Sequence, residues 1–248
     1  MFSDLIDDLD DHSSGPDLFL DVPFVPTDEA LIEAILEFAD VGRKDVLYDL
    51  GSGDGRIPVA AALSRGARGV GVDIDPRRVA EAMEYAGDSR AEYLVDFIEE
   101  DFFTTDFSEA TVVTLYLLDS INVQLRPRLL DELRPGARVI SHAFDMGDWK
   151  PDERLELGGT KLYKWIIPAR VAGPWEWEGP DGRLYQIDLQ QKYQDVSGSA
   201  WVAGKEAHLR HATLRGACLA LEIKTDDETS SSHFVLDFED HTLEAVSC

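Results

Sequence analysis

The chain has 248 residues, 44% of them hydrophobic, and its 49 acidic side chains outnumber the 23 Lys and Arg. This length suits one large domain, or a medium domain with a small one. The formal net charge of −26 disfavours nucleic acid as the main partner and anionic membrane surfaces as a binding site, because both need basic side chains. Two explanations of the acidity stay open: solubility, for instance in a high-salt cytoplasm, and attraction of a cationic substrate.

The cysteine content and the hydropathy pattern narrow the class further. Cys218 and Cys248 are the two cysteines, and no CxxC or Cys/His spacing accompanies them, so neither a disulfide framework nor a metal site is predicted. The first residues lack the basic flank and apolar run of a signal peptide. No apolar run is long enough to span a bilayer, so we expect no membrane insertion and a cytoplasmic location.

The amino-terminal part reads as an acidic lead followed by a helix. Residues 1–21 contain seven aspartates and no Lys or Arg, which predicts disorder. Two prolines then favour an extended segment over residues 23–27. Thr27 is predicted to cap a helix whose apolar face is formed by Leu31, Ile32, Ile35, Leu36 and Ala39.

Strand and helix patterns alternate over the next part of the chain. Strands are predicted at Val46–Leu50, Gly69–Ile74, Asp96–Glu100, Thr111–Leu118 and Arg138–Phe144. Helices are predicted at Arg56–Ser64, Pro76–Tyr85 and Ser120–Leu133, the last bent or restarted near Pro127. A closing hairpin is predicted from Leu155–Leu157 and Leu162–Ile167. The alternation predicts an α/β fold with a doubly wound, largely parallel sheet.

The pattern changes after Pro168. Glycines and prolines cluster, and short alternating runs follow, including Ala212–Leu221 and His233–Phe238. We therefore expect three parts: the acidic lead at 1–21, an α/β domain at 22–169, and a small antiparallel sheet or barrel at 170–248.

A glycine-rich turn after the first predicted strand is the sharpest functional signal. Asp49-Leu50-Gly51-Ser52-Gly53-Asp54-Gly55 leaves an apolar strand and enters a helix, which is where doubly wound sheets bind ligands. No Gly-Lys-Ser/Thr follows, so a P-loop is excluded, and Arg56 stands where a dinucleotide fingerprint needs its third glycine. Asp49 suits a ligand that carries an ammonium group, as S-adenosylmethionine does.

Two further acidic positions support a nucleoside ligand. Asp73 ends the second strand 22 residues after Gly51, close to the spacing of about 20 expected of a ribose-binding acid. Asp75 is predicted to cap the next helix, ahead of Pro76. Asp101 could accept the adenine amine while Phe102 packs on the ring; solvation of the loop is the alternative for Asp101.

Together these residues resemble the seven-strand class I S-adenosylmethionine-dependent methyltransferases. More narrowly, they are similar to the small protein-lysine methyltransferases of archaea and their mitochondrial relatives that modify an ATP synthase c-subunit. The resemblance covers about residues 22–169 and includes Pro23–Thr27, Tyr48–Arg56, Gly71–Asp75, Asp101–Phe103, Ala110–Leu118 and Arg138–His142.

The resemblance implies a Rossmann-like sheet, S-adenosyl-L-methionine as cofactor, and Pro26 and Thr27 as part of the cofactor wall. Asp73 departs from the family, which usually has Glu there, and the tail after residue 170 has no counterpart in the smallest members. The residues predicted to line the cofactor site are Pro26, Thr27, Asp49, Gly51, Ser52, Gly53, Asp73, Ile74, Asp101 and Phe102.

The methyl acceptor is less constrained by the sequence. Tyr116, at the carboxyl end of the fourth predicted strand, is the first candidate for lining an acceptor channel, ahead of Phe24 and Trp149. His142 could orient the acceptor or take its proton, although a lone histidine on an apolar strand also suits the core. Asp119-Ser120 stands where amide and adenine methyltransferases carry an Asn/Asp-Pro-Pro-aromatic motif.

Three functions stay open at this point: methylation of a protein lysine, methylation of a small molecule, and cofactor binding without catalysis. The sequence does not define the oligomeric state.

Overall fold

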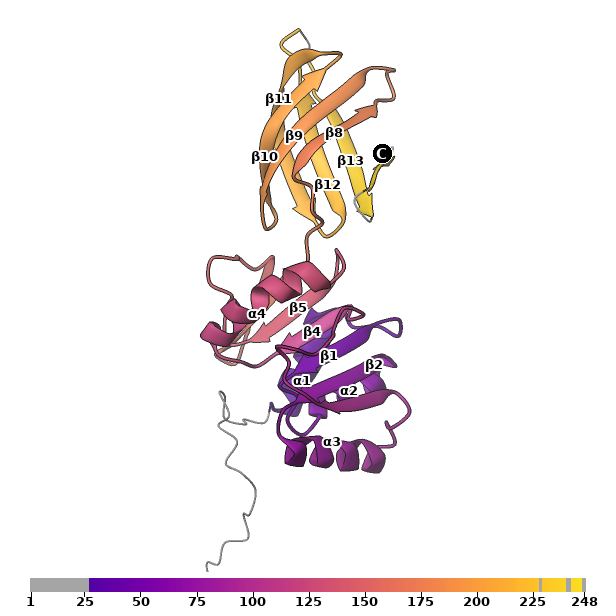
Figure 1. Ribbon diagram of the computed structural model, residues 1–248, viewed down its shortest axis with the longest axis vertical. Helices are drawn as coiled ribbons and strands as arrows, with labels where there is room; N and C mark the ends of the chain where they lie inside the picture. Colours follow the sequence, from indigo (N-terminus) through magenta and orange to yellow (C-terminus); the bar gives the residue numbers. More distant parts are fainter. Residues whose placement is uncertain (1–26, 228, 240–241, 247–248) are drawn as a thin grey trace, which may run out of the picture.

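The computed structural model describes residues 27–227, 229–239 and 242–246 and folds them into two units, each built on a seven-stranded sheet (Figure 1). The acidic lead predicted at 1–21, and also Phe24 and Pro26, lie outside the described residues. The chain passes from the first sheet to the second between Ile166 and Gly173. The domain limits 22–169 and 170–248 remain predictions.

The first sheet is the doubly wound sheet expected from the alternating pattern. Its strands are β1 (Val46–Leu50), β2 (Arg68–Asp73), β3 (Val95–Glu99), β4 (Val112–Leu115), β5 (Arg138–His142), β6 (Glu153–Leu157) and β7 (Thr160–Ile166). They are ordered β3-β2-β1-β4-β5-β7-β6, and β1 to β5 are parallel while β7 runs antiparallel to both neighbours. The strand order reverses between β1 and β4, so a ligand crevice is expected at the carboxyl ends of these two strands.

Helices cover both faces of this sheet. They are α1 (Glu29–Phe38), α2 (Arg56–Arg65), α3 (Pro76–Asp88) and α4 (Asp119–Glu132). The apolar face of α1 packs with α2 against β1, β4, β5 and β7, whereas α4 packs on the opposite face through residues such as Leu125 and Leu129. Figure 1 shows α3 beside α2 at the β2–β3 side of the sheet. Because both faces are covered, the central strands β1 and β4 are almost wholly buried and mainly apolar, as expected for parallel strands.

The helix caps confirm one prediction and correct another. Asp75 caps α3 by accepting a hydrogen bond from the Arg77 backbone N–H at 3.0 Å, as predicted. The cap of α1 is Asp28, which accepts from the Leu31 backbone N–H at 2.9 Å, so the prediction for Thr27 was wrong by one residue. Asp28 has the extended backbone of a cap residue.

Several elements differ from their predicted extents, and β5 ends at His142 instead of Phe144 because the chain turns at Ala143. β4 ends at Leu115 instead of Leu118, because its pairing ends with Leu50 of β1 and the chain then turns into α4. α4 runs as one helix over Asp119–Glu132 with Pro127 inside it, so no restart occurs. The early end of β4 places residues 116–118 in the connection between β4 and α4.

The second unit is an antiparallel sheet, as the tail pattern predicts. Its strands, ordered as in the sequence, are β8 (Gly173–Glu178), β9 (Leu184–Lys192), β10 (Asp195–Val202), β11 (Lys205–Arg215), β12 (Cys218–Lys224), β13 (Ser232–Glu239) and β14 (Thr242–Val246). The sheet curls, since the Trp175 ring of β8 meets the Phe238 ring of β13 edge-on at 5.0 Å. The run Ala212–Leu221 is not one strand: Gly216, with φ of 60°, turns the chain between β11 and β12.

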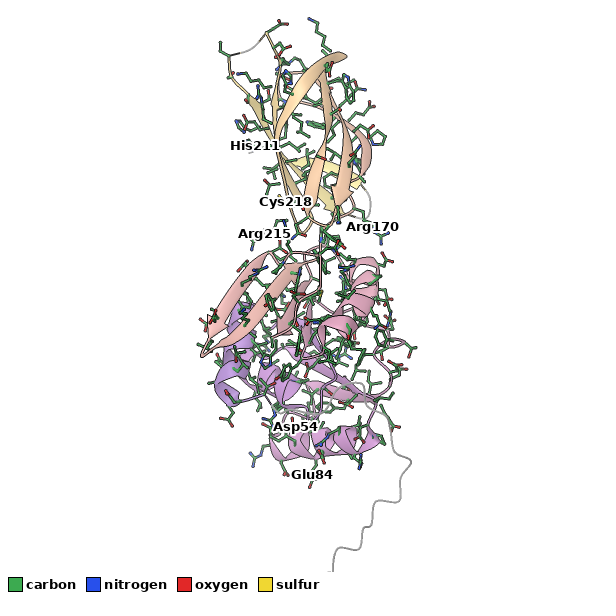
Figure 2. All side chains as sticks on the ribbon, turned by 90° about the vertical axis from the view of Figure 1, so that its left-hand side faces the viewer. Asp54, Glu84, Arg170, His211, Arg215 and Cys218 are labelled. Atoms are coloured by element: carbon green, nitrogen blue, oxygen red, sulfur yellow. The ribbon has the colours of Figure 1, made fainter. Side chains whose placement is uncertain are left out.

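The two units meet at the amino-terminal edge of the first sheet. The Ala169 N–H donates to the Gly216 carbonyl at 2.8 Å, and a Cβ on Gly216 would lie 3.1 Å from the Gly136 Cα, just before β5. In Figure 2, Arg170 and Arg215 lie at this joint, where Arg170 pairs with Asp131 at 2.5 Å.

An aromatic cluster extends the joint along α4. The Trp149 indole is fully buried, donates to the Gln194 side chain at 2.8 Å and stacks on the Tyr193 ring at 5.7 Å. The Trp165 indole of β7 donates to the Trp149 carbonyl at 2.9 Å. The cluster therefore links the first sheet to the connection between β9 and β10.

Asp148, next to this cluster, binds side chains of both units. It accepts from Arg126 of α4 at 2.6 Å and from Tyr193 at 3.1 Å, and it pairs with Lys192 of β9 at 2.9 Å. Hydrogen bonds from Lys192 and Arg126 hold the pKa of the Asp148 carboxyl well below its usual range.

Candidate functional site

The glycine loop leaves β1 at the strand reversal and is fixed to the end of β2. Both Gly51 and Ser52 donate their backbone N–H groups to the Val72 carbonyl, at 2.8 and 3.0 Å. Gly51, Gly53 and Gly55 all have positive φ, which glycine adopts without strain. A Cβ on Gly55 would lie 2.5 Å from the Phe97 ring, so this turn also needs glycine for space. The loop is therefore a preformed backbone cradle.

Asp49 places a buried carboxyl under this cradle. Its side chain is 4% exposed and accepts a hydrogen bond from the Thr114 hydroxyl at 2.6 Å. Burial raises the pKa of Asp49 to about 7, against the lowering effect of the Thr114 hydrogen bond, and the nearby charges of Asp73 and Asp54 raise it further. A carboxyl of this kind would be stabilised in its ionised form by a cation.

Asp73 lies at the end of β2, beside the same cradle. Its Oδ2 accepts from the Gly53 N–H at 2.8 Å and its Oδ1 from the Asp75 N–H at 2.9 Å. These two bonds fix the carboxylate, and an ionised carboxylate has about four lone-pair sites, so acceptor capacity remains for a ligand. The side chain is partly exposed and can be reached from solvent.

Arg56 ties the amino-terminal segment to the loop. Its guanidinium pairs with Asp54 at 2.5 Å and donates to the Thr27 carbonyl at 2.6 Å. The buried Thr27 is thereby held next to the start of α2. Figure 2 shows Asp54 far from Arg170 and Arg215, so the loop and the joint lie at opposite ends of the first unit.

The loop after β3 carries Asp101 and Phe102. Asp101 accepts from the Phe103 N–H at 2.8 Å, so one carboxylate oxygen stabilises the local turn, a role that the sequence did not indicate. Phe102 is half-buried, and its ring lies 4.9 Å from that of Phe103. Arg128 of α4 donates to the Phe102 carbonyl at 2.9 Å and holds the loop against the sheet.

A pair of stacked rings lies at the carboxyl ends of β4 and β5. The Tyr116 and His142 ring centroids are 3.7 Å apart, with 26° between the planes. The Leu117 side chain, next to Tyr116, would lie 3.1 Å from a Cβ on Gly51, so this segment borders the glycine loop. Burial lowers the pKa of His142, while the charge of Asp28 opposes this shift.

The Nδ1 atom of His142 adds a chemical feature to this pair. It is buried and has no hydrogen-bond partner among the described residues. Because burial also lowers the pKa of His142, the neutral imidazole is favoured, and a neutral imidazole has one ring nitrogen that can accept a hydrogen bond from an incoming group.

The structure gathers most of the predicted site residues at one edge of the first sheet. Asp49, Gly51, Ser52, Gly53 and Asp73 meet at the ends of β1 and β2, and Ile74 follows with 42% of its surface exposed. Their contacts with a cofactor remain predictions. Trp149, a weaker candidate for the acceptor channel, instead belongs to the aromatic cluster at the joint.

Three residues of this site were missed in the sequence. Thr114 faces Asp49 because β4 pairs with β1 in the register Asp49↔Thr114. Arg56 could have been noticed as the first residue after the loop. Arg128 had no sequence signal, because its contact with the β3 loop spans 26 residues.

Two further features, a metal-binding cluster and a membrane-spanning helix, are absent from the described part of the chain. Over residues 27–227, 229–239 and 242–246, no group of three or more His, Cys, Asp or Glu side chains is placed to hold a metal ion. No helix within these ranges has the length and apolar character needed to cross a membrane.

Comparisons with known proteins agree on the class of this fold. The family model described as "ANTKMT methyltransferase domain" matches residues 49–153. A protein-lysine N-methyltransferase of Saccharolobus islandicus is 42% identical over 137 residues, which are 55% of this chain and 85% of the relative. A lysine N-methyltransferase of Rattus norvegicus, named for the ATP synthase c-subunit, is 32% identical over 60% of this chain and 68% of the relative.

A solved structure is also similar over nearly its whole length. It is described as an RNA methyltransferase from Salinibacter ruber in complex with S-adenosyl-L-homocysteine. The two sequences are 52% identical, the match covers 59% of this chain and 96% of that chain, and the TM-score is 0.58.

Proposed function

We propose that this chain, which belongs to the class I S-adenosylmethionine-dependent methyltransferases in the family of the protein-lysine N-methyltransferases, methylates a lysine side chain of a protein. The observation that carries the lysine proposal is the stacked Tyr116–His142 pair beside the glycine loop. It offers an apolar wall and a nitrogen acceptor at the edge where the methyl donor is expected to bind.

The residues at this edge fit the cofactor. We infer that Asp49, which is buried and about half ionised at pH 7, pairs in its ionised form with the ammonium group of the methionine part. Asp73 has remaining acceptor capacity for the ribose hydroxyls, and Phe102 has a half-buried ring beside which adenine can pack. Ile74 and Thr27 would add apolar and backbone contacts at the rim, and Pro26 is kept as a candidate from the sequence.

The chemistry asks little of the protein beyond positioning. When bound, the cofactor supplies a methyl group that is already activated on a positively charged sulfur. The chain's own task is to hold an amine in line with that group and to exclude water. We propose that Tyr116 packs against the lysine stem, that the dry surroundings lower the pKa of the lysine ammonium so that it loses its proton to solvent before attack, and that His142 Nδ1 orients the neutral amine as a hydrogen-bond acceptor.

Two other acceptors are the alternatives. RNA is raised by the similarity to the Salinibacter ruber protein, and the net charge of −26 opposes it. A small-molecule acceptor is the second alternative, because the second unit could have shaped a pocket for it. The groove on the tail is lined by Pro174, Trp175 and Trp201, on the unit that joins the first sheet at its amino-terminal edge. It therefore does not favour a small-molecule site beside the glycine loop.

The test is incubation of the full chain with methyl-labelled cofactor and a lysate of its source cells. We expect the label to appear in protein, so that protease treatment releases it and ribonuclease treatment does not. Mass spectrometry of the digested labelled protein should then show methyl-lysine. Asp73→Ala is the matched control, because we expect it to lose the cofactor. Label that ribonuclease removes, or label confined to small molecules, would overturn the lysine proposal. A cytoplasmic location and the absence of a nucleic-acid acceptor remain predictions.

A further inference from the structure

Phe144 extends the aromatic pair at the ends of β4 and β5. Its ring centroid lies 6.3 Å from that of Tyr116, with 32° between the planes, and Tyr116 in turn stacks on His142 at 3.7 Å. Tyr116 and Phe144 are both partly exposed, whereas His142 is 8% exposed. The three rings therefore form one surface that continues from the segment bordering the glycine loop toward solvent.

The backbone holds Phe144 in this place against a local cost. Ala143 has φ of 66°, a left-handed conformation that is unfavourable for a residue with a Cβ. Its N–H donates to the Lys161 carbonyl of β7 at 2.8 Å, and the Phe144 N–H donates back to the His142 carbonyl at 2.9 Å. These bonds turn the chain directly after β5 and keep Phe144 beside the strand end.

Contacts from α4 fix the same turn from the other side. Asn122, which is fully buried, donates from Nδ2 to the Phe144 and Asp145 carbonyls at 3.4 and 3.3 Å. Asp119 accepts from the Asp145 N–H at 2.8 Å. A non-glycine residue in a left-handed conformation that the surroundings determine so fully is typical of functional sites.

We infer that Phe144 is a specificity-determining residue for the acceptor, forming with Tyr116 and His142 an aromatic wall that receives a lysine side chain. The inference rests on the proposed lysine methylation. Lysine suits such a wall because its four-carbon stem is apolar and its ammonium is attracted to aromatic faces. The wall also excludes water from the amine as it approaches the methyl donor.

The test compares Phe144→Ala, Phe144→Leu and Phe144→Tyr. Tyr93→Ala is the control, at a residue that is 90% exposed and lies just before β3, away from Phe144 in the sequence. The acceptor is the protein band that carries label in the lysate experiment. A contact with a cation on an aromatic face is worth about 0.5–2 kcal/mol, so Phe144→Ala should raise the KM for the acceptor about 2- to 30-fold. The Kd for S-adenosylhomocysteine, measured by calorimetry, should stay unchanged.

The conservative variants separate packing from aromatic character. Phe144→Tyr should keep the KM of the wild-type protein, and Phe144→Leu should fall between Tyr and Ala, with thermal unfolding showing that each variant is folded. An unchanged acceptor KM in Phe144→Ala, or an equal loss of S-adenosylhomocysteine affinity, would overturn the role of Phe144 alone. Transfer by the wild-type chain to an acceptor other than lysine would overturn the proposed function and this inference with it.

Discussion

Replacing Asp49 with asparagine should stabilise the cofactor-free protein at high pH. The pKa of Asp49 is raised from 3.8 to about 7, mainly by burial, so the folded chain holds a proton that the unfolded chain releases above pH 3.8. Stability therefore falls as the pH rises from 3.8 to about 7, and the loss is constant above that. A shift of about three units at about 1.4 kcal/mol each corresponds to roughly 4 kcal/mol.

The substituted asparagine would not ionise, and its side-chain oxygen can keep the hydrogen bond from Thr114. We expect Asp49→Asn to raise the free energy of unfolding by roughly 4 kcal/mol at pH 8 and by roughly 2 kcal/mol at pH 5, where the unfolded carboxyl is ionised and the folded one is not. Urea unfolding followed by circular dichroism, without cofactor, measures both values. Asp195→Asn, at an exposed position of β10, is the control and should change neither.

Equal stabilisation by Asp49→Asn at the two pH values would refute a buried, protonated Asp49.

The same carboxyl should also make cofactor affinity depend on pH, and here the affinity should rise as the pH rises. Because the ammonium of S-adenosylhomocysteine would favour the ionised form, its Kd should be about tenfold higher at pH 6 than well above pH 7. Asp49→Asn should bind weakly at both. Thr114→Val removes the hydrogen bond that lowers the pKa of Asp49, so the change in affinity should move to higher pH.

Substitutions at three other positions test the cofactor edge. Asp73→Ala should weaken S-adenosylhomocysteine binding at least about tenfold in calorimetry, because charged hydrogen bonds are lost, while Asp73→Glu should stay within about tenfold of the wild type; equal affinities for all three would contradict a sugar-binding role. Gly55→Ala should destabilise the fold by about 1–3 kcal/mol more than Gly136→Ala in urea, since both have positive φ but only Gly55 faces the Phe97 ring. Arg128→Ala should raise the cofactor Kd about 3- to 10-fold by loosening the β3 loop, without changing the acceptor KM; an unchanged Kd would show that the loop is fixed by other contacts.

Much of the first sheet could be predicted from the sequence, because its parallel strands are buried on both faces and are separated by helices. The strand Val46–Leu50 was predicted with the bounds it has, and Asp75 before Pro76 marks the start of α3. The end of β4 could not be predicted. Leu117 is as apolar as the strand, and only the end of pairing with β1 places it in the connection.

The candidate site was predictable where residues adjacent in sequence act together, as in the glycine loop. Contacts set by strand pairing were not, so Thr114 was missed although it lies on the neighbouring strand. The stacking of Tyr116 on His142 likewise follows from the pairing of β4 with β5. In the tail, Gly216 stands in a run that reads as one strand, and its positive φ emerges only in the folded chain.

The fluorescence of Trp149, at the joint, reports whether the two units are docked on each other. The Trp149 indole is shielded from water by the side chains of Tyr193 and Gln194, which both belong to the second unit. Separation of the two units would expose the Trp149 indole to water and shift its fluorescence emission maximum to longer wavelengths. The rest of the first unit could stay folded. The chain thus contains an intrinsic fluorescent reporter of whether the second unit stays docked on the first during turnover.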